Sequence, residues 1–242
     1  MSKINTENWL EAPNNKESFQ KVESLFESVR IKRSSQEPSR LSQNLNSLDC
    51  IQIQDIEGQN KTFREMLTST HTDAFLVLKD GEILFEEYFN GMKPDSFHLM
   101  NSITKSFVGM LVGVLVDKGI LDISDKVSKY VPELKEGSFS NTTIQSALDM
   151  SSAVKFEEDY DDPLCDFWKE ASVVGWRPDL VDESSPSSLL DFAMSLKDTE
   201  QEEIGGYHYR SVLTNVIAMV VERATNENLK DLIPYKRDEN MI

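Results

Sequence analysis

The chain has 242 residues, and its 42 acidic and 25 basic side chains give a formal net charge of −17. Hydrophobic residues make up 39% of the sequence, which is enough for a core, so we do not expect wholesale disorder. We expect no binding to nucleic acid or to an anionic membrane surface, because both need a concentrated positive charge.

The N-terminal sequence MSKINTENWLEAPNNKES contains no apolar region of the kind found in signal peptides. The longest apolar stretch, Phe107 to Val116, has about half the length needed to cross a bilayer. We therefore expect a cytoplasmic protein. In that compartment Cys50 and Cys165 are expected to be reduced thiols rather than a disulfide.

The first half of the chain predicts one helix and one hairpin. Apolar residues recur with helical spacing over residues 17–31, which predicts an amphipathic helix. After a polar linker, two runs rich in Val, Ile, Leu and Phe flank Asp80-Gly81, a pair typical of hairpin turns. We expect strands at residues 74–78 and 82–89. A hairpin alone is an incomplete sheet, so either other strands complete it or the chain lacks them.

The second half predicts mainly helices. Residues 102–117 are apolar nearly all round, which favours a helix buried in the middle of a domain, with Gly109 and Gly113 letting neighbours approach closely. The segment 155–182 is acidic, aromatic and irregular. Further helices are expected at 121–132, at 144–150 with a threonine cap, from Ser185-Pro186 to Leu196, and at 211–224.

Ser102 and Lys105 form an S-x-x-K motif at the start of the apolar helix. Residues i and i+3 share a helix face, so the amine can reach the hydroxyl. A serine nucleophile needs such a base, and a lysine with little water around it can serve as one. Taken alone, the motif is more often a solvated helix end. The apolar run that follows Lys105 favours the catalytic interpretation.

Tyr209-Arg210-Ser211 lies just before the last helix and contains the pattern Tyr-x-Ser. A phenol beside a Ser–Lys pair could carry a proton between the nucleophile and a leaving group. The alternative is that Tyr207 and Tyr209 are simply core aromatics at a helix start.

Three segments together resemble the serine β-lactamase-related family: NSITKSFVGMLVGVLVDKGILD, TTIQSALDMSSAVKFEEDYDDP and YHYRSVLTNVIAMVVERAT. Within this family the chain is most similar to 6-aminohexanoate-dimer hydrolases, and the resemblance covers residues 70–225. It implies an α+β fold of the β-lactamase/transpeptidase type, with a helical block packed on an antiparallel sheet that is incomplete here. We expect an N-terminal helix and extended segment over residues 1–60 and the hydrolase domain over 61–242.

The resemblance also implies the catalytic roles. Ser102 would be the nucleophile that forms an acyl-enzyme, Lys105 its general base and Tyr209 the proton relay. The backbone N–H of Ser102 would be one oxyanion donor. The substrate would be a small-molecule ester or amide.

The resemblance further implies three substrate-binding residues. Ser211 would be the polar companion of the second motif, and Tyr160 and Trp176 would close over the substrate. For Tyr160 and Trp176, a role as loop or core anchors is an equal alternative.

One motif of the family is missing. A K-T-G or H-T-G triplet should follow the second motif on a later strand, but none occurs after Tyr209. His71-Thr72-Asp73 lies too far upstream to replace it. We therefore expect a C-terminally truncated member. Two other functions stay open: a catalytically impaired remnant that acts as a binding or interaction protein, and a penicillin-binding-like protein.

No cofactor or metal is expected. The three histidines share no metal-ligand spacing, there is no C-x-x-C, and no nucleotide-binding glycine motif occurs. The acidic cluster within residues 157–162 lacks the pattern of an EF-hand and is better interpreted as a solvated loop. The sequence leaves a homodimer open as an oligomeric state.

Overall fold

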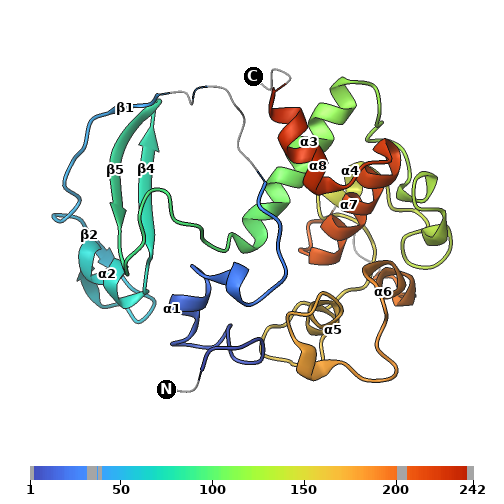
Figure 1. Cartoon of the computed structure of the whole chain (residues 1–242), viewed down its shortest axis with the longest axis horizontal. Coiled ribbons are helices and arrows are strands. Elements are labelled where there is room, and N and C mark those ends of the chain that lie inside the picture. Colours follow the sequence, from blue (N-terminus) through green and yellow to red (C-terminus); the bar gives the residue numbers. More distant parts are fainter. Residues whose placement is uncertain (1–2, 32–36, 38–39, 201–205, 239–242) are drawn as a thin grey trace. The chain divides into compact units, whose positions relative to one another are not determined.

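The computed structural model describes residues 3–31, 37, 40–200 and 206–238, which form two compact units (Figure 1). The first unit is Met1–Glu27 with Gln36–Leu99, and the second is Ser28–Ser35 with Met100–Ile242. Each unit has its own hydrophobic cluster.

The first unit contains the sheet. Its elements are α1 (Asn15–Ser18), the 3₁₀ turn η1 (Val22–Ser24), β1 (Ser42–Gln43), β2 (Gln52–Gln54), β3 (Asn60–Thr62), α2 (Phe63–Ser69), β4 (Ala74–Lys79) and β5 (Glu82–Tyr88). The main sheet has the order β1-β5-β4, and β2 pairs with β3. The β4–β5 hairpin confirms the sequence prediction, and β1 makes the sheet mixed because it runs parallel to β5.

The turn of the hairpin explains why its position was predictable. Asp80 has φ 51° and Gly81 has φ 80°, so both central residues adopt the left-handed conformation. This is the pattern of a type I′ turn, whose twist matches that of the two strands.

The helix predicted over residues 17–31 is wrong. Only α1 and η1 form there. The apolar residues instead surround the buried side chain of Trp9: the ring of Phe19 lies 6.0 Å from that of Trp9, and the ring of Phe26 lies 5.0 Å away. Tertiary packing around one indole therefore overrides the helical spacing.

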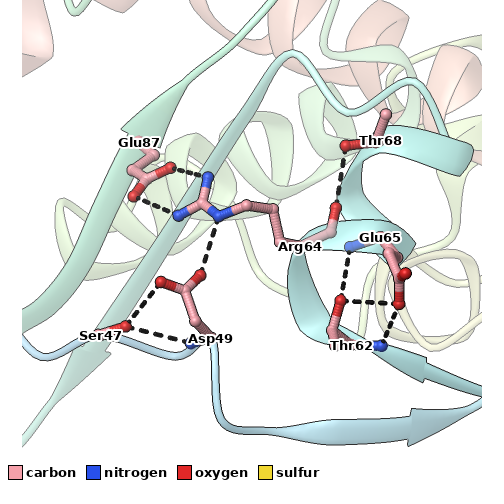
Figure 2. A network of polar contacts seen from close by, with 7 residues as sticks. All are labelled: Ser47, Asp49, Thr62, Arg64, Glu65, Thr68 and Glu87. Carbon is pink, nitrogen blue, oxygen red and sulfur yellow. Dashed lines mark hydrogen bonds and ion pairs between the residues drawn. The ribbon is translucent and has the colours of Figure 1, made fainter.

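A polar network joins α2 to the hairpin (Figure 2). The Arg64 guanidinium donates two hydrogen bonds of 3.0 Å to the Glu87 carboxylate on β5, and its Nε donates to Asp49 at 2.8 Å. Thr62 and Glu65 form a capping box at the start of α2. Beside this network lies the small core of the unit: Phe63, Leu67 and Phe85.

The second unit is helical. Its elements are η2 (Asn101–Ile103), α3 (Thr104–Asp117), η3 (Val127–Lys129), η4 (Pro132–Leu134), α4 (Ile144–Leu148), α5 (Asp166–Val173), η5 (Pro178–Leu180), α6 (Leu189–Ser195), α7 (Ser211–Thr225) and α8 (Leu229–Asp238). Helices α4 and α7 agree with the prediction, and Thr143 is the predicted cap of α4. Three predictions need correction: only 3₁₀ turns form near residues 121–134, α6 begins after Pro186 with Ser188 as its cap, and α5 lies inside the segment expected to be irregular.

Helix α3 is not buried all round. Its residues Val108, Leu111, Val112 and Leu115 join the core, whereas Met110 is 54% exposed. A Cβ added at either glycine of this helix would meet no described atom within 4 Å, so the expectation that they permit close packing is also wrong. Helix α3 therefore has more apolar residues than its buried face contains.

Candidate active site

Ser102 and Lys105 lie where η2 passes into α3. Ser102 is exposed in the 3₁₀ turn, and Lys105 is half-buried in the first turn of the helix. Asn101 has φ 45°, a left-handed conformation that asparagine tolerates better than most residues. This backbone bend lies immediately before Ser102 and so affects the direction of the Ser102 side chain.

The hydroxyl of Ser102 receives two hydrogen bonds. Lys105 Nζ donates to Ser102 Oγ at 3.0 Å, and Tyr209 Oη donates to the same oxygen at 2.7 Å. Lys105 Nζ also lies 5.3 Å from the centroid of the Tyr209 ring. The structure therefore brings together the three residues that the sequence singled out.

Tyr209 is held by the residues on either side of it. The backbone N–H of His208 donates to the Met150 carbonyl at 2.9 Å. Arg210 is fully buried and donates to the Glu200 carboxylate at 2.7 Å and to the His208 carbonyl at 3.0 Å. Because breaking a buried ion pair is costly, this pairing stabilises the conformation of the motif. By contrast, Tyr207 is 73% exposed and is not a core residue.

Ser211 begins α7 and is buried between two carboxylates. Its backbone N–H donates to Glu158 at 3.0 Å, and its hydroxyl donates to Glu170 Oε2 at 3.2 Å. The other Glu170 oxygen accepts a hydrogen bond of 2.8 Å from Asn215. The second motif is therefore connected to a polar network that reaches α5.

Tyr160 joins the same network, because its hydroxyl donates to Glu158 Oε1 at 2.7 Å. Burial of the hydroxyl and the hydrogen bond to Glu158 raise the pKa of Tyr160 well above its ordinary value. The hydrogen bond described for Trp176 runs from its backbone N–H to the Ala171 carbonyl at 2.9 Å, and it does not join Trp176 to Ser102. Of the two aromatic residues expected over the substrate, Tyr160 is thus linked to the second motif.

Sequence reasoning missed Glu170 and Asn215, and it assigned Glu158 to a solvated loop. Glu158 is in fact half-buried and hydrogen-bonded. Burial, opposed by hydrogen bonds from Asn215 and Ser211, raises the pKa of Glu170 to about 7. Asn215 could have been found, because it stands four residues after Ser211 on one helix face. No local pattern distinguishes Glu170 from a surface glutamate.

A cavity of about 450 Å³ is lined by residues of α3, α4 and α7. Its lining includes Lys105, Ser106, Gly109, Asp149 and Thr214. A volume of this size is in the range of small-molecule sites. Within the described part of the chain, no three His, Cys, Asp or Glu side chains come together as metal ligands. Among the helices described, none is long and apolar enough to cross a membrane.

Comparison with known proteins identifies the family of this chain. Residues 60–234 match the beta-lactamase family model. The chain belongs to the beta-lactamase family. The predicted fold class, α+β of the β-lactamase/transpeptidase type, is thereby confirmed.

Two relatives are similar over most of the chain. A 6-aminohexanoate-dimer hydrolase of Paenarthrobacter ureafaciens is 32% identical over 221 residues, which are 90% of this chain and 53% of that protein. The solved structure named "Putative 6-aminohexanoate-dimer hydrolase from Bacillus anthracis" matches with a TM-score of 0.82 at 24% identity, over 97% of this chain and 61% of that one. The chain thus spans about half the length of the curated relative that it matches.

Proposed function

We propose that the protein is a serine hydrolase that cleaves an ester or amide bond through an acyl-enzyme on Ser102. The observation that carries this proposal is the pair of hydrogen bonds that Ser102 Oγ accepts from Lys105 and Tyr209, at 3.0 and 2.7 Å. A serine alcohol is a weak nucleophile until a neighbouring base removes its proton. We place this activity in the domain expected over residues 61–242.

In acylation, Ser102 Oγ forms a bond to the substrate carbonyl carbon while its proton passes to the neutral amine of Lys105. The carbonyl oxygen then carries a negative charge, toward which the backbone N–H of Ser102 is proposed to donate. Tyr209 gives its proton to the leaving nitrogen or oxygen as the carbon–leaving-group bond breaks, and the phenolate recovers a proton from Lys105. Proton transfer of this kind typically contributes about 10²- to 10⁴-fold to the rate.

In deacylation the same groups act in reverse. A water molecule loses a proton to the basic pair and attacks the acyl carbon, and Ser102 Oγ leaves with a proton. The family's third motif would supply a second oxyanion donor. Loss of one such donor typically costs about 10²- to 10³-fold in rate.

The proposed substrate class is small linear amides and carboxylic esters. The name of the relative from P. ureafaciens points to an amide between two 6-aminohexanoate units. Tyr160 and Trp176 are proposed to border the substrate, and Ser211 to be the polar residue of the second motif beside it. The 450 Å³ cavity whose lining includes Lys105 is large enough for part of such a molecule.

The test is the intact mass of the folded protein after exposure to a serine-reactive phosphonate. We expect one adduct on the wild type, none on Ser102→Ala, and one on the control Ser124→Ala, which changes another exposed serine of the same unit. Absence of an adduct on the folded wild type, or its persistence in Ser102→Ala, would favour the binding or interaction protein instead.

Turnover of p-nitrophenyl acetate and of the linear 6-aminohexanoate dimer then separates the substrate classes. We expect hydrolysis of the ester by the wild type and none by Ser102→Ala. If a labelled penicillin forms a stable adduct and neither substrate is cleaved, the penicillin-binding alternative is correct.

A further inference from the structure

Glu170 is a buried carboxyl that the proposed chemistry does not use. It lies on α5 and is only 5% exposed. Each of its two oxygens receives one hydrogen bond from α7, from Ser211 at 3.2 Å and from Asn215 at 2.8 Å. Burying a carboxyl is unfavourable unless it is hydrogen-bonded, so these contacts are what the position requires.

These two donors lie at the start of α7, one helical turn apart. Ser211 follows Tyr209 by two residues, and Tyr209 in turn contacts Ser102. A carboxylate that accepts hydrogen bonds from both donors therefore fixes the start of α7, to which the Tyr209 segment is attached. Glu158 holds the same residue from another side, through the backbone N–H of Ser211.

Two charges act on Glu170 from outside its own helix. The negative charge of Glu158 raises the pKa of Glu170, and the positive charge of Lys105 lowers it. The acidic groups on the other elements packed against α5 have their own partners: Asp179 on η5 pairs with Arg177, and Asp191 on α6 accepts from two serines. Glu170 is thus held by its hydrogen bonds to α7 rather than by a surface ion pair.

We propose that Glu170 is a positioning residue of the active site, which fixes the start of α7 and with it the Tyr209 segment. This inference rests on the proposed function, in which Tyr209 protonates the leaving group. Loss of the Glu170 hydrogen bonds should therefore slow the cleavage of an amide more than that of an activated ester, whose leaving group needs no proton.

The first experiment compares hydrolysis of an amide, the linear 6-aminohexanoate dimer, with hydrolysis of p-nitrophenyl acetate in the wild type, in Glu170→Ala and in the control Lys135→Met, which removes an exposed lysine of the same unit. We expect the amide rate of Glu170→Ala to fall at least tenfold more than its ester rate, because nitrophenolate leaves without a proton. Lys135→Met should follow the wild type on both substrates.

The second experiment applies the same comparison to Glu170→Gln. This variant keeps the shape and an acceptor for Asn215 but has no charge, so we expect its ratio of amide to ester hydrolysis to stay close to that of the wild type. The control Asp117→Asn, at the far end of α3, should follow the wild type. A ratio in Glu170→Gln as low as in Glu170→Ala would overturn the proposal.

A merely structural role would lower the amide and ester rates of Glu170→Ala together, and that result would overturn the proposal. If Glu170→Ala does not fold, Asn215→Ala, which removes one of the two donors to Glu170, is compared in the same way, and a smaller loss in the same direction is expected. If the wild type cleaves neither substrate and is not modified by the phosphonate, the proposed function fails, whereas equal losses in an active protein overturn only the role of Glu170.

Discussion

At the scale of single residues, the hydroxyl of Tyr209 is the group whose role can be isolated most cleanly. Tyr209→Phe removes the donor that lies 2.7 Å from Ser102 Oγ and leaves the ring that packs against the core. We expect amide hydrolysis to fall by about 10²- to 10⁴-fold, because an amine leaves only with a proton. Hydrolysis of p-nitrophenyl acetate should fall much less, since nitrophenolate leaves without one.

The matched control for this variant is Tyr207→Phe. Tyr207 is 73% exposed and stands two residues before Tyr209, so its loss should change neither reaction. Equal losses on the amide and the ester in Tyr209→Phe would mean that the phenol does not protonate the leaving group. A similar loss in Tyr207→Phe would mean that the segment as a whole has been disturbed.

The raised pKa of Glu170 predicts how the stability of the protein depends on pH. Its pKa of about 7 in the folded protein lies above its ordinary value of 4.5, so the protonated form favours folding. This contribution is complete below pH 4.5 and is lost as the pH rises through 7, by about 3 kcal/mol at most. Urea unfolding from pH 5 to 8 should show this loss in the wild type and a flatter profile in Glu170→Gln. Parallel profiles would contradict it.

The proposed catalytic residues were predictable because their spacing in the sequence is typical of this type of catalysis. Ser102 and Lys105 are separated by one helical turn, and Tyr209 stands in a second short motif, so both patterns are visible in the sequence. Glu158 and Glu170 were not predictable as site residues. What distinguishes them is burial against α7, and that burial arises only when segments some 40 to 50 residues apart meet.

At the scale of elements, alanine substitutions of two glycines should change the free energy of unfolding in opposite directions. Gly81 has φ 80° in the hairpin turn, so Gly81→Ala should lower the free energy of unfolding by about 1 kcal/mol through strain. Gly113 lies inside α3 with ordinary helical geometry and open space around its Cα, so Gly113→Ala should raise it by about 0.5–1 kcal/mol. Urea unfolding measures both. A loss of stability in Gly113→Ala would show that this face of α3 is covered in solution.

The elements predicted correctly are those whose signals are local. The Asp80-Gly81 turn, the Thr143 cap and the apolar spacing of α7 each act within a few residues. The helix expected over residues 17–31 failed because its apolar side chains pack around Trp9 instead of forming one helix face. Helix α5 was missed because its sequence is acidic and aromatic, and its buried face is polar at Glu170.

At the scale of the whole molecule, the proposed catalytic residues and the network around Ser211 all come from the second unit. The first unit contributes the three-stranded sheet but only a small core. The matched part of this chain covers 53% of the relative from P. ureafaciens. Because its core is small, we expect the sheet-containing unit to be the less stable of the two.

Hydrogen exchange followed by mass spectrometry compares the two units in the intact protein. The core cluster of the first unit has three buried residues, whereas that of the second draws on α3, α4, α6, α7 and α8. Because local opening is easiest where few apolar contacts must break, we expect β4 and β5 to exchange faster than α7. An unfolded sample provides the reference rates. Equal protection of the hairpin and α7 would contradict this expectation and would mean that the chain unfolds as one cooperative body.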